Sequence, residues 1–311
     1  MDELYQQLKK FGKIKINEPL SKHTTFKIGG PTRYLLVINE TEKMIEALDF
    51  LSGQGVDYLL IGGGSNVLMP DEGFDGVIIK VKSEKFIVDD TIISADAGVS
   101  LAEMVRVASA NSLSGMEWAI GIPGTIGGAV IGNAGAMGKD MSDILIKVEV
   151  WQAGEILELS KDDCYFSYRH SALKDNKDVV LRAHIGLQKG ERKDILALTQ
   201  KYIIQRAGRI GKGYSCGCFF KNLELEKWPG SRDQLEKIFI ERKKVPAGWL
   251  IEKAGCVGMS NGGARISEKH NSIIENDGTA SRADVMALVE DIKEKVYNKF
   301  RVELEYEVQI I

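Results

Sequence analysis

The stretch Gly121–Gly138, GIPGTIGGAVIGNAGAMG, decides how this chain folds. Seven of its positions are glycine, and no side chain in it is charged; Lys139 follows directly. Glycine lets a backbone amide come close to a ligand, and Pro123 makes the preceding Ile122 extended. Such a rigid, uncharged, amide-rich surface can bind a diphosphate without a cationic side chain. Tight turns in a buried β-region would have the same composition, so this stretch alone leaves both interpretations open.

A second glycine-rich loop, IGGGSNVLM at Ile61–Met69, follows directly on a predicted strand over residues 58–61. Its amides, the Ser65 hydroxyl and the Asn66 side chain suit a phosphate or a ribityl group. The loop matches neither the P-loop pattern nor the dinucleotide fingerprint. A tight loop capped by asparagine is the alternative, but two such loops in one chain favour a cofactor cradle.

Composition narrows the class of protein. The 311 residues allow two or three domains. A net charge of −3 and the lack of a polybasic segment argue against nucleic-acid or membrane-surface binding. The N-terminal residues lack the apolar core of a signal peptide, and no apolar run reaches the roughly 18 residues of a membrane span. Four cysteines make no disulfide framework in a chain of this size. We therefore expect a cytoplasmic protein; its oligomeric state stays open.

Periodicity and turn residues predict an α+β fold in three parts, residues 1–84, 85–198 and 199–311. In the first part we expect helices over 2–11 and 42–51, the latter capped by Thr41, and strands over 33–38, 58–61 and 76–81. In the second we expect a hairpin of 86–88 with 91–95, strands over 146–151 and 179–187, and helices over 100–110 and about 194–206. Ser100 has Glu103 at the capping-box offset.

The third part is expected to contain several helices and a closing strand. We predict helices around 233–243, within 247–255, and from a cap at Ser281, with Asp284 at the capping-box offset. The last helix has an apolar stripe of Val285, Leu288, Val289, Ile292 and Val296. An alternating strand over 302–310 is predicted to end the chain, with Glu303, Glu305 and Glu307 on one face.

Three further side chains are candidates for chemistry. Arg169, beside aromatic residues in CYFSYRHSALK, could bind a carboxylate or phosphate bidentately, although most arginines are surface residues. Cys218 lies with Cys216 in SCGCFFKN; a thiol with a reference pKa of about 8.5 can donate a proton near neutral pH. Two small half-buried residues are the ordinary interpretation of this pair, and without further ligands at metal spacing we predict no metal site. A solvated strand face is the ordinary interpretation of Glu307.

Taken together, the segments resemble the UDP-N-acetylenolpyruvoylglucosamine reductase family. The matching segments occur in the family's order from about His23 to Val308: HTTFKIGG, IGGGSNVL, GIPGTIGGAVIGNAGAMG, YRHSALK, SCGCFFKN, AGWLIEKAG, ARISEKHNSIIEN and LEYEV. The interval between Arg169 and Cys218 is short, as in the family's compact subclass, which lacks an extra substrate-covering loop there.

The resemblance implies a two-lobed FAD-binding domain of the vanillyl-alcohol-oxidase type, followed by a C-terminal α+β substrate-binding domain. It implies non-covalently bound FAD and NADPH as the hydride donor. The residues assigned to FAD are Ile61, Gly62, Gly63, Gly64, Ser65, Asn66, Gly121, Ile122, Pro123, Gly124, Thr125, Gly127, Gly128, Asn133 and Ala134. Neither glycine-rich loop contains a histidine or cysteine that could tether the flavin.

The resemblance also implies the roles of the reacting groups. Arg169 matches the arginine that faces the enolpyruvyl carboxylate, Cys218 the proton donor and Glu307 the catalytic glutamate, here a proposed protonated partner of Arg169. Residues implied near the UDP-sugar substrate are Tyr168, Arg206, Lys221 and Asn222. The family's donor is usually serine, so Cys218 is a departure that puts rate and pH profile in doubt.

Two other interpretations predict different observations. Another flavoprotein of the same fold, acting on an alcohol or hydroxy acid, would explain the two loops but not YRHSALK, SCGCFFKN and LEYEV together. A metal-binding or redox-sensing module built on Cys216 and Cys218 predicts colourless protein, which a flavin absorption spectrum would exclude.

Overall fold

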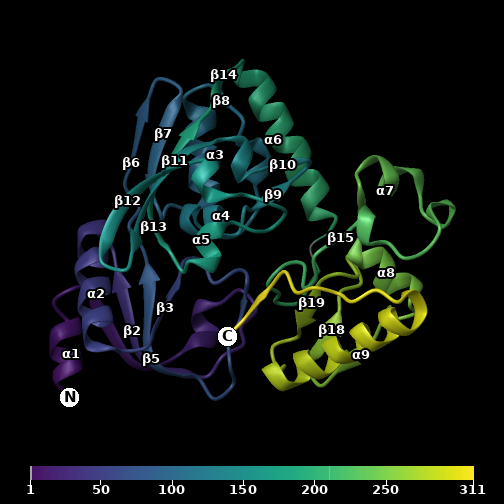
Figure 1. Ribbon diagram of the computed structural model, residues 1–311, viewed down its shortest axis with the longest axis horizontal. Coiled ribbons are helices and arrows are strands. Elements are labelled where there is room, and N and C mark those ends of the chain that lie inside the picture. Colours follow the sequence, from purple (N-terminus) through teal and green to yellow (C-terminus); the bar gives the residue numbers. More distant parts are fainter. Residues whose placement is uncertain (1, 210) are drawn as a thin grey trace. The chain divides into compact units, whose positions relative to one another are not determined.

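The computed structural model describes residues 2–209 and 211–311. The chain forms two compact units, and Figure 1 traces it through both. Unit 1 comprises residues 1–18, 32–63 and 74–207, and unit 2 comprises residues 19–31, 64–73 and 208–311. Both contain helices and strands, which confirms the α+β class. The predicted division into three parts, with boundaries at residues 84 and 198, rests on the sequence and stays a prediction.

Unit 1 contains a four-stranded sheet in which β2 and β3 both run parallel to β5. In sheet order its strands are β1 (Lys13–Pro19), β2 (Pro31–Ile38), β5 (Phe74–Val81) and β3 (Tyr58–Ile61). Helix α2 (Thr41–Gln54) connects β2 to β3 and buries Met44, Leu48 and Leu51 in the core that the strands share. It ends at Gly55, whose φ is +63°. The predicted cap was wrong by one residue, because Glu40 is the N-cap and Thr41 is the first helical residue.

The second sheet of unit 1 is antiparallel and has five strands (Figure 1). In sheet order they are β12 (Glu155–Ser160), β11 (Leu145–Gln152), β13 (Val179–Gly186), β7 (Ile92–Asp96) and β6 (Phe86–Asp89). Helices α3 (Leu101–Ala110), α4 (Ile126–Ile131) and α6 (Arg192–Ala207) accompany it, and α4 contacts β13 and β7. Ser100 caps α3 as predicted by accepting the Glu103 N–H at 3.1 Å, whereas the Glu103 carboxylate binds Arg106. The predicted hairpin and strands of this region are confirmed.

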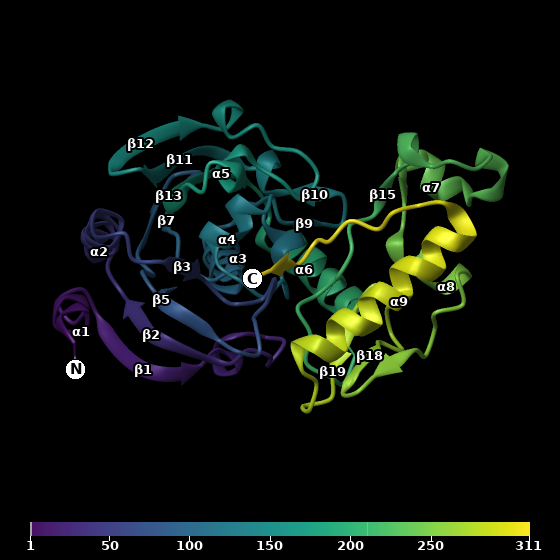
Figure 2. The same ribbon diagram turned by 60° about the horizontal axis from the view of Figure 1, so that its bottom comes forward.

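Unit 2 is built around its longest helix, α9 (Arg282–Phe300). The predicted capping box of Ser281 and Asp284 is present, and all five residues of the predicted apolar stripe are fully buried. Figure 2 shows α9 lying across a small antiparallel sheet. The strands of that sheet are β17 (Ser260–Asn261), β18 (Ala264–Ile266) and β19 (Ile274–Asn276). Helix α8 (Ala247–Lys253), the predicted short helix, packs beside α9.

Two early segments of the chain complete unit 2. Strand β4 (Val67–Leu68) pairs in parallel with β20 (Gln309–Ile310) at the end of the chain. The Asn276 side chain donates to the Phe26 carbonyl at 2.9 Å, and Asp71 accepts the Arg282 N–H at 2.8 Å. Nothing in the local pattern of residues 19–31 or 64–73 indicates these partners, because they lie more than 200 positions further along the chain.

Two predicted elements were wrong in extent. The helix expected over 233–243 is a 3₁₀ turn, η6 (Arg232–Gln234), followed by the short helix α7 (Lys237–Glu241). Of the strand expected over 302–310, only β20 is formed, although Val302, Leu304 and Val308 are buried in alternation as predicted. The remaining helices, 3₁₀ turns and strands are α1 (Glu3–Leu8), η1 (Leu20–His23), β8 (Leu113–Ser114), η2 (Glu117–Ala119), β9 (Gly135–Ala136), β10 (Lys139–Asp140), η3 (Met141–Asp143), η4 (Asp162–Cys164), α5 (Ala172–Asp175), β14 (Gln188–Lys189), β15 (Leu223–Glu224), η5 (Leu225–Lys227) and β16 (Lys244–Val245). Among residues 2–209 and 211–311, no helix has the length and apolar character needed to span a membrane.

Candidate functional site

Within unit 1, Gly62 and Gly63 of the first glycine-rich loop lie beside Gly124 and Thr125 of the second. A Cβ added to Gly63 would stand 3.0 Å from the Gly124 Cα, and one added to Gly62 would stand 2.3 Å from the Thr125 Oγ1. A side chain at Gly62 would force the Thr125 side chain to move, and one at Gly63 would contact Gly124 more tightly than nearly all real Cβ atoms do. The second loop is fixed by the N–H of Leu101, which donates to the Gly124 carbonyl at 3.1 Å.

The apposed loops present backbone amides rather than a closed apolar core. Gly63 and Gly121 are exposed and Gly124 is half-buried. In the described part of the chain, no backbone hydrogen bond outside helices and strands uses the amides of these three glycines. Gly121 has a φ of +70° and Gly124 one of +137°, backbone conformations that side chains rarely permit. An anionic diphosphate is the group that such accessible N–H groups bind, so these residues fit the FAD that the sequence predicted.

Three residues assigned to the cofactor have bonds inside the protein instead. The N–H of buried Gly127 donates to the Ala97 carbonyl at 2.9 Å, and that of Ala134 to the Ala129 carbonyl at 2.8 Å. Asn133 donates from Nδ2 to the Ser167 carbonyl at 3.0 Å and accepts the Ser142 N–H at 3.1 Å. These groups shape the loop, and any contact of theirs with a cofactor stays a prediction.

The first loop continues into unit 2. Gly64 has a φ of +64°, and a Cβ there would stand 2.2 Å from the His23 carbonyl oxygen. Its own carbonyl accepts the Thr25 N–H at 2.9 Å. Asn66 donates from Nδ2 to the Glu307 carbonyl at 3.2 Å. The loop is therefore bonded on one side to residues 23–25 and on the other to the end of the chain.

Arg169 stands in a strained turn of unit 1. Ser167 and His170 exchange two backbone hydrogen bonds, of 3.0 and 3.2 Å, which close a two-residue turn of Tyr168 and Arg169. Arg169 has a φ of +58°, which is uncommon for a non-glycine residue and is found preferentially at functional sites. Its Nη2 donates to the Gly135 carbonyl at 2.8 Å, and its guanidinium lies 5.2 Å from the centre of the Tyr168 ring. The side chain is thus oriented before any ligand binds.

A second cation of unit 1 lies beside the glycine-rich stretch. Arg206, near the end of α6, donates from Nη2 to the Trp118 carbonyl at 3.1 Å. A Cβ on Gly121 would stand 3.1 Å from its Cδ. The structure therefore places Arg206 against the second loop, whereas its predicted contact with the sugar nucleotide stays a prediction.

A bulge in unit 2 sets the position of Cys218. Tyr214 bridges to Asn276 and Cys218 to Ile273, so the five residues 214–218 run opposite the four residues 273–276. Gly217 absorbs the extra residue with a φ of +83°. Bulges of this kind redirect side chains and are common beside active sites. Cys218 is half-buried, whereas the other three free cysteines are buried.

Cys216 is unsuited to acid–base chemistry. It is 3% exposed, and its burial raises the pKa of its thiol far above the ordinary range, with the charges of Cys218 and Glu307 acting in the same direction. Of the C-x-C pair, Cys218 is therefore the candidate acid.

Glu307 follows the segment that pairs with residues 219–221. Its N–H donates to the Phe219 carbonyl at 2.9 Å, and Phe220 bridges to Tyr306. The rings of Phe219, Phe220 and Tyr306 lie 5.5 to 5.9 Å apart, which stiffens this pairing. Cys218 and Glu307, almost 90 positions apart in sequence, thus lie on neighbouring segments of unit 2.

The two remaining substrate candidates of unit 2 have partners inside that unit. Asn222 accepts the Ala247 N–H at 3.0 Å, which holds the first residue of α8. Lys221 lies 3.6 Å from the Glu305 carboxylate. Their predicted contacts with the substrate stay predictions.

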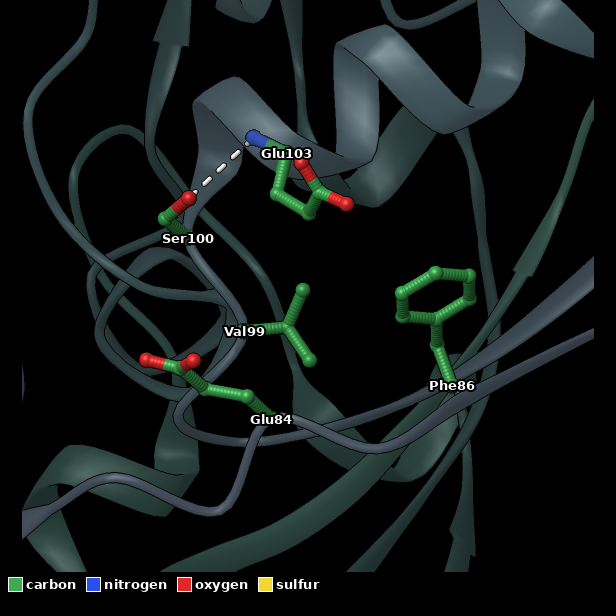
Figure 3. Close-up of a pocket in the computed structure, with 5 residues that line it drawn as sticks. All are labelled: Glu84, Phe86, Val99, Ser100 and Glu103. Atoms are coloured by element: carbon green, nitrogen blue, oxygen red, sulfur yellow. Dashed lines mark hydrogen bonds between the residues drawn. The ribbon is translucent and has the colours of Figure 1, made fainter.

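Two further features of unit 1 lie outside the predicted site. Figure 3 shows a small pocket of about 250 Å³ lined by Glu84, Phe86, Val99, Ser100 and Glu103, none of which was assigned to the site. The side-chain atoms of Glu149, Glu158 and His184 that could bind a metal ion lie within 4.8 Å of one another on the antiparallel sheet. Lys147 pairs with Glu158 at 2.7 Å and Arg182 with Glu149 at 3.7 Å, so cations already neutralise these carboxylates.

Sequence reasoning missed two interactions of the predicted residues. It did not indicate that the Gly135 carbonyl holds Arg169 or that Asn66 binds the backbone of Glu307. Both are contacts between segments far apart in the chain. Motif matching could have indicated that these segments belong to one site, but it could not have identified which atoms form the hydrogen bonds.

Comparison with known proteins agrees with this description. A profile described as an FAD binding domain matches residues 31–160, and one described as the C-terminal domain of UDP-N-acetylenolpyruvoylglucosamine reductase matches residues 209–311. The UDP-N-acetylenolpyruvoylglucosamine reductase of Caldanaerobacter subterraneus is 39% identical, covering all of this chain and 97% of the relative. That of Bacillus subtilis is 36% identical, covering all of this chain and 99% of the relative.

A solved structure agrees over nearly the whole chain. The crystal structure of UDP-N-acetylenolpyruvylglucosamine reductase from Thermus caldophilus superimposes with a TM-score of 0.77 at 30% identity, covering 96% of this chain and 98% of that one. The chain therefore belongs to the UDP-N-acetylenolpyruvoylglucosamine reductase family of FAD-binding oxidoreductases.

Proposed function

We propose that this protein reduces the enolpyruvyl ether of UDP-N-acetylglucosamine enolpyruvate to UDP-N-acetylmuramate, a step of peptidoglycan precursor synthesis, with NADPH as reductant. The observation that carries the proposal is the pair of apposed glycine-rich loops with accessible amides, in a chain of this family. Bound without a covalent link, FAD supplies the transfer of hydride from NADPH to the terminal carbon of the enolpyruvyl double bond.

The residues that hold the cofactor are proposed to be those of the two loops. The amides of Gly63, Gly121 and Gly124 bind the diphosphate, since they are accessible and take part in no described loop hydrogen bond. Thr125 keeps the loops at a fixed separation, because its side chain occupies the space next to Gly62. Ser65 supplies a hydroxyl to the same cofactor.

Arg169 is proposed to bind the enolpyruvyl carboxylate. Negative charge builds up next to that carboxylate when hydride arrives, and a guanidinium oriented in advance stabilises it without reorganising. The hydrogen bond to the Gly135 carbonyl and the contact with the Tyr168 ring supply that orientation. The left-handed backbone of Arg169 is consistent with a side chain whose direction matters more than the local stability of its turn.

Cys218 is proposed to deliver the proton that completes the reduction. It is the only cysteine of the described chain that is not buried, and the bulge at residues 215–217 directs it. Glu307, on the neighbouring segment, is proposed to carry a proton beside the carboxylate that Arg169 binds and so to share in stabilising the charge.

The experiment that tests the function follows NADPH oxidation by absorbance, with and without the enolpyruvyl nucleotide-sugar. We expect a flavin spectrum from the purified protein, slow oxidation of NADPH alone, and rapid oxidation with formation of UDP-N-acetylmuramate when the sugar is added. Oxidation of an alcohol or hydroxy acid, with no turnover of the enolpyruvyl sugar, would instead support another flavoenzyme of this fold.

The role of Cys218 is tested separately with Cys218→Ala and, as a matched control, Cys216→Ala. Flavin reduction by NADPH should survive in both variants, because no proton from the thiol is needed for it. Formation of the lactyl ether should fall at least a hundredfold in Cys218→Ala, within the range that general acids contribute, and should persist in the control. Normal product formation by Cys218→Ala would remove this residue from the mechanism.

A further inference from the structure

Asn66 connects the first glycine-rich loop to the last residues of the chain through its side-chain amide and its backbone carbonyl. Its side-chain Nδ2 donates to the Glu307 carbonyl at 3.2 Å, and its backbone carbonyl accepts the Gln309 N–H at 3.0 Å. Beyond it, β4 and β20 pair in parallel, and the Ile311 N–H donates to the Leu68 carbonyl at 3.1 Å. All these groups lie within unit 2.

The side chain of Asn66 bonds to Glu307, the residue at which the pairing with the segment of Phe219 ends. The Glu307 N–H is used by the Phe219 carbonyl, and its carbonyl by Asn66. The backbone of Glu307 is thus held between the segment of Cys218 on one side and the loop on the other. An asparagine can do this because it offers a donor to the Glu307 carbonyl while its own backbone accepts from Gln309.

The length of the paired segment makes this bond important. The strand pair of β4 and β20 is only two residues long, and a strand pair with so few hydrogen bonds opens easily. Removing the side-chain bond would leave the Glu307 carbonyl without this fixed donor. The stretch of the chain bonded to residues 66–68 would then begin at Gln309 instead of Glu307.

We infer that Asn66 is a positioning residue that fixes Glu307: the loop assigned to the cofactor also sets the position of the proposed catalytic carboxylate. The consequence for catalysis rests on the proposed function. The fixing of the Glu307 backbone by Asn66, which we call the clamp, does not rest on the proposed function, because it can be measured on the protein without substrate.

The first experiment is amide hydrogen exchange of the FAD-loaded protein, read at Ile311, whose N–H bonds to Leu68. Asn66→Ala removes the side-chain donor, and Gln309→Pro removes the N–H that binds the Asn66 carbonyl from the opposite side. The matched controls are Gln309→Ala, which keeps that N–H, and Asn176→Ala, which deletes a side-chain amide bonded to Asp178 in unit 1.

We expect exchange at Ile311 to accelerate about fivefold or more in Asn66→Ala and Gln309→Pro, which corresponds to the loss of about one hydrogen bond. Both controls should stay within twofold of the unmodified protein. Unchanged exchange in Asn66→Ala, or equal acceleration in Gln309→Ala, overturns the clamp regardless of which reaction the enzyme catalyses.

The second experiment measures the two half-reactions separately with FAD at saturation. In Asn66→Ala we expect kcat for reduction of the enolpyruvyl sugar to fall about tenfold with little change in KM, since Glu307 is proposed to act in the transition state, and we expect this loss to exceed any loss in flavin reduction by NADPH. Equal losses in both half-reactions would assign Asn66 to cofactor binding alone and overturn the positioning role. If the unmodified enzyme reduces no enolpyruvyl sugar, the proposed function fails while the exchange result still stands.

Discussion

Replacing Gly64 by alanine tests whether the first loop needs glycine at the point where it enters unit 2. Gly64 has a φ of +64°, and an added Cβ would stand 2.2 Å from the His23 carbonyl oxygen and 3.0 Å from the Thr24 Cα. Both obstacles are backbone atoms, so no side chain can rotate away. An ordinary carbon–oxygen contact is roughly 1 Å longer, so the loop or residues 23–24 must move.

Gly55→Ala separates the two sources of cost. Gly55 has almost the same φ, +63°, but nothing within 4 Å of an added Cβ. Left-handed alanine costs about 1–2 kcal/mol, and the smaller entropy of the unfolded alanine chain offsets about 0.4–1 kcal/mol. Gly55→Ala should therefore lose between about 0 and about 1.6 kcal/mol. Gly64→Ala adds overpacking of about 1–3 kcal/mol, and movement of the loop also strains the bond from Thr25 to the Gly64 carbonyl.

The assay compares urea unfolding of the two apoproteins and their affinity for FAD, measured by quenching of flavin fluorescence. We expect Gly64→Ala to be less stable than Gly55→Ala by about 1–3 kcal/mol and to bind FAD at least about tenfold more weakly, an affinity loss of about 1.4 kcal/mol. Gly55→Ala should bind FAD normally. Equal stability of the two variants together with normal FAD binding in both would refute the reasoning, because it would mean that the loop tolerates a side chain at this point.

Three further outcomes are expected. Iodoacetamide should label Cys218 first, because the other three thiols are buried. Burial also raises the pKa of Cys164 to about 11 and raises the pKa of Cys216 and of Cys256. Mass spectrometry of briefly treated protein checks this prediction, and earlier labelling of another cysteine contradicts it. Arg169→Lys should lower kcat/KM for the enolpyruvyl sugar about a hundredfold or more, since lysine lacks the planar fork that can bind a carboxylate bidentately; steady-state kinetics with NADPH fixed measures it, and a change under threefold would exclude bidentate binding. Burial and the charge of Arg209 lower the pKa of His270, so the unfolded state binds its proton more readily, and the contribution of His270 to stability is present above about pH 6.5 and lost as pH falls toward its folded pKa. Urea unfolding at several pH values should show a shallower fall of stability in His270→Gln, and an unchanged slope would show that the pKa of His270 is the same in the folded and unfolded states.

The local fold around Cys218 bears on the predicted departure from the serine that the resemblance implies at this position. Because residues 214–218 contain one residue more than the strand opposite, the direction of the side chain at 218 depends on the bulge and on Gly217. A thiol is larger than a hydroxyl, and a bulge at a strand edge can accommodate the extra volume more easily than a packed core can. The pH profile of Cys218→Ser would report how much of the reaction depends on the acidity of the thiol.

The sequence by itself determined the elements whose cause is local. The Ser281 capping box, the apolar stripe of α9 and the Ser100 cap follow from residues three or four positions apart. Family membership was also readable from the sequence, since it depends on the order of short motifs. The predicted helix over 233–243 and the long final strand were wrong because propensity does not show where a segment breaks to satisfy distant partners.

Only the tertiary structure decided which distant groups meet. Gly63 faces Gly124, Asn66 holds the backbone of Glu307, and Gly135 holds Arg169, although each pair is separated by more than thirty positions. Residues 19–31 and 64–73 belong to the same unit as residues 208–311 for the same reason. Burial and backbone hydrogen bonding are satisfied by the whole chain at once, so the partner of a glycine or an asparagine is set by packing far from its own motif.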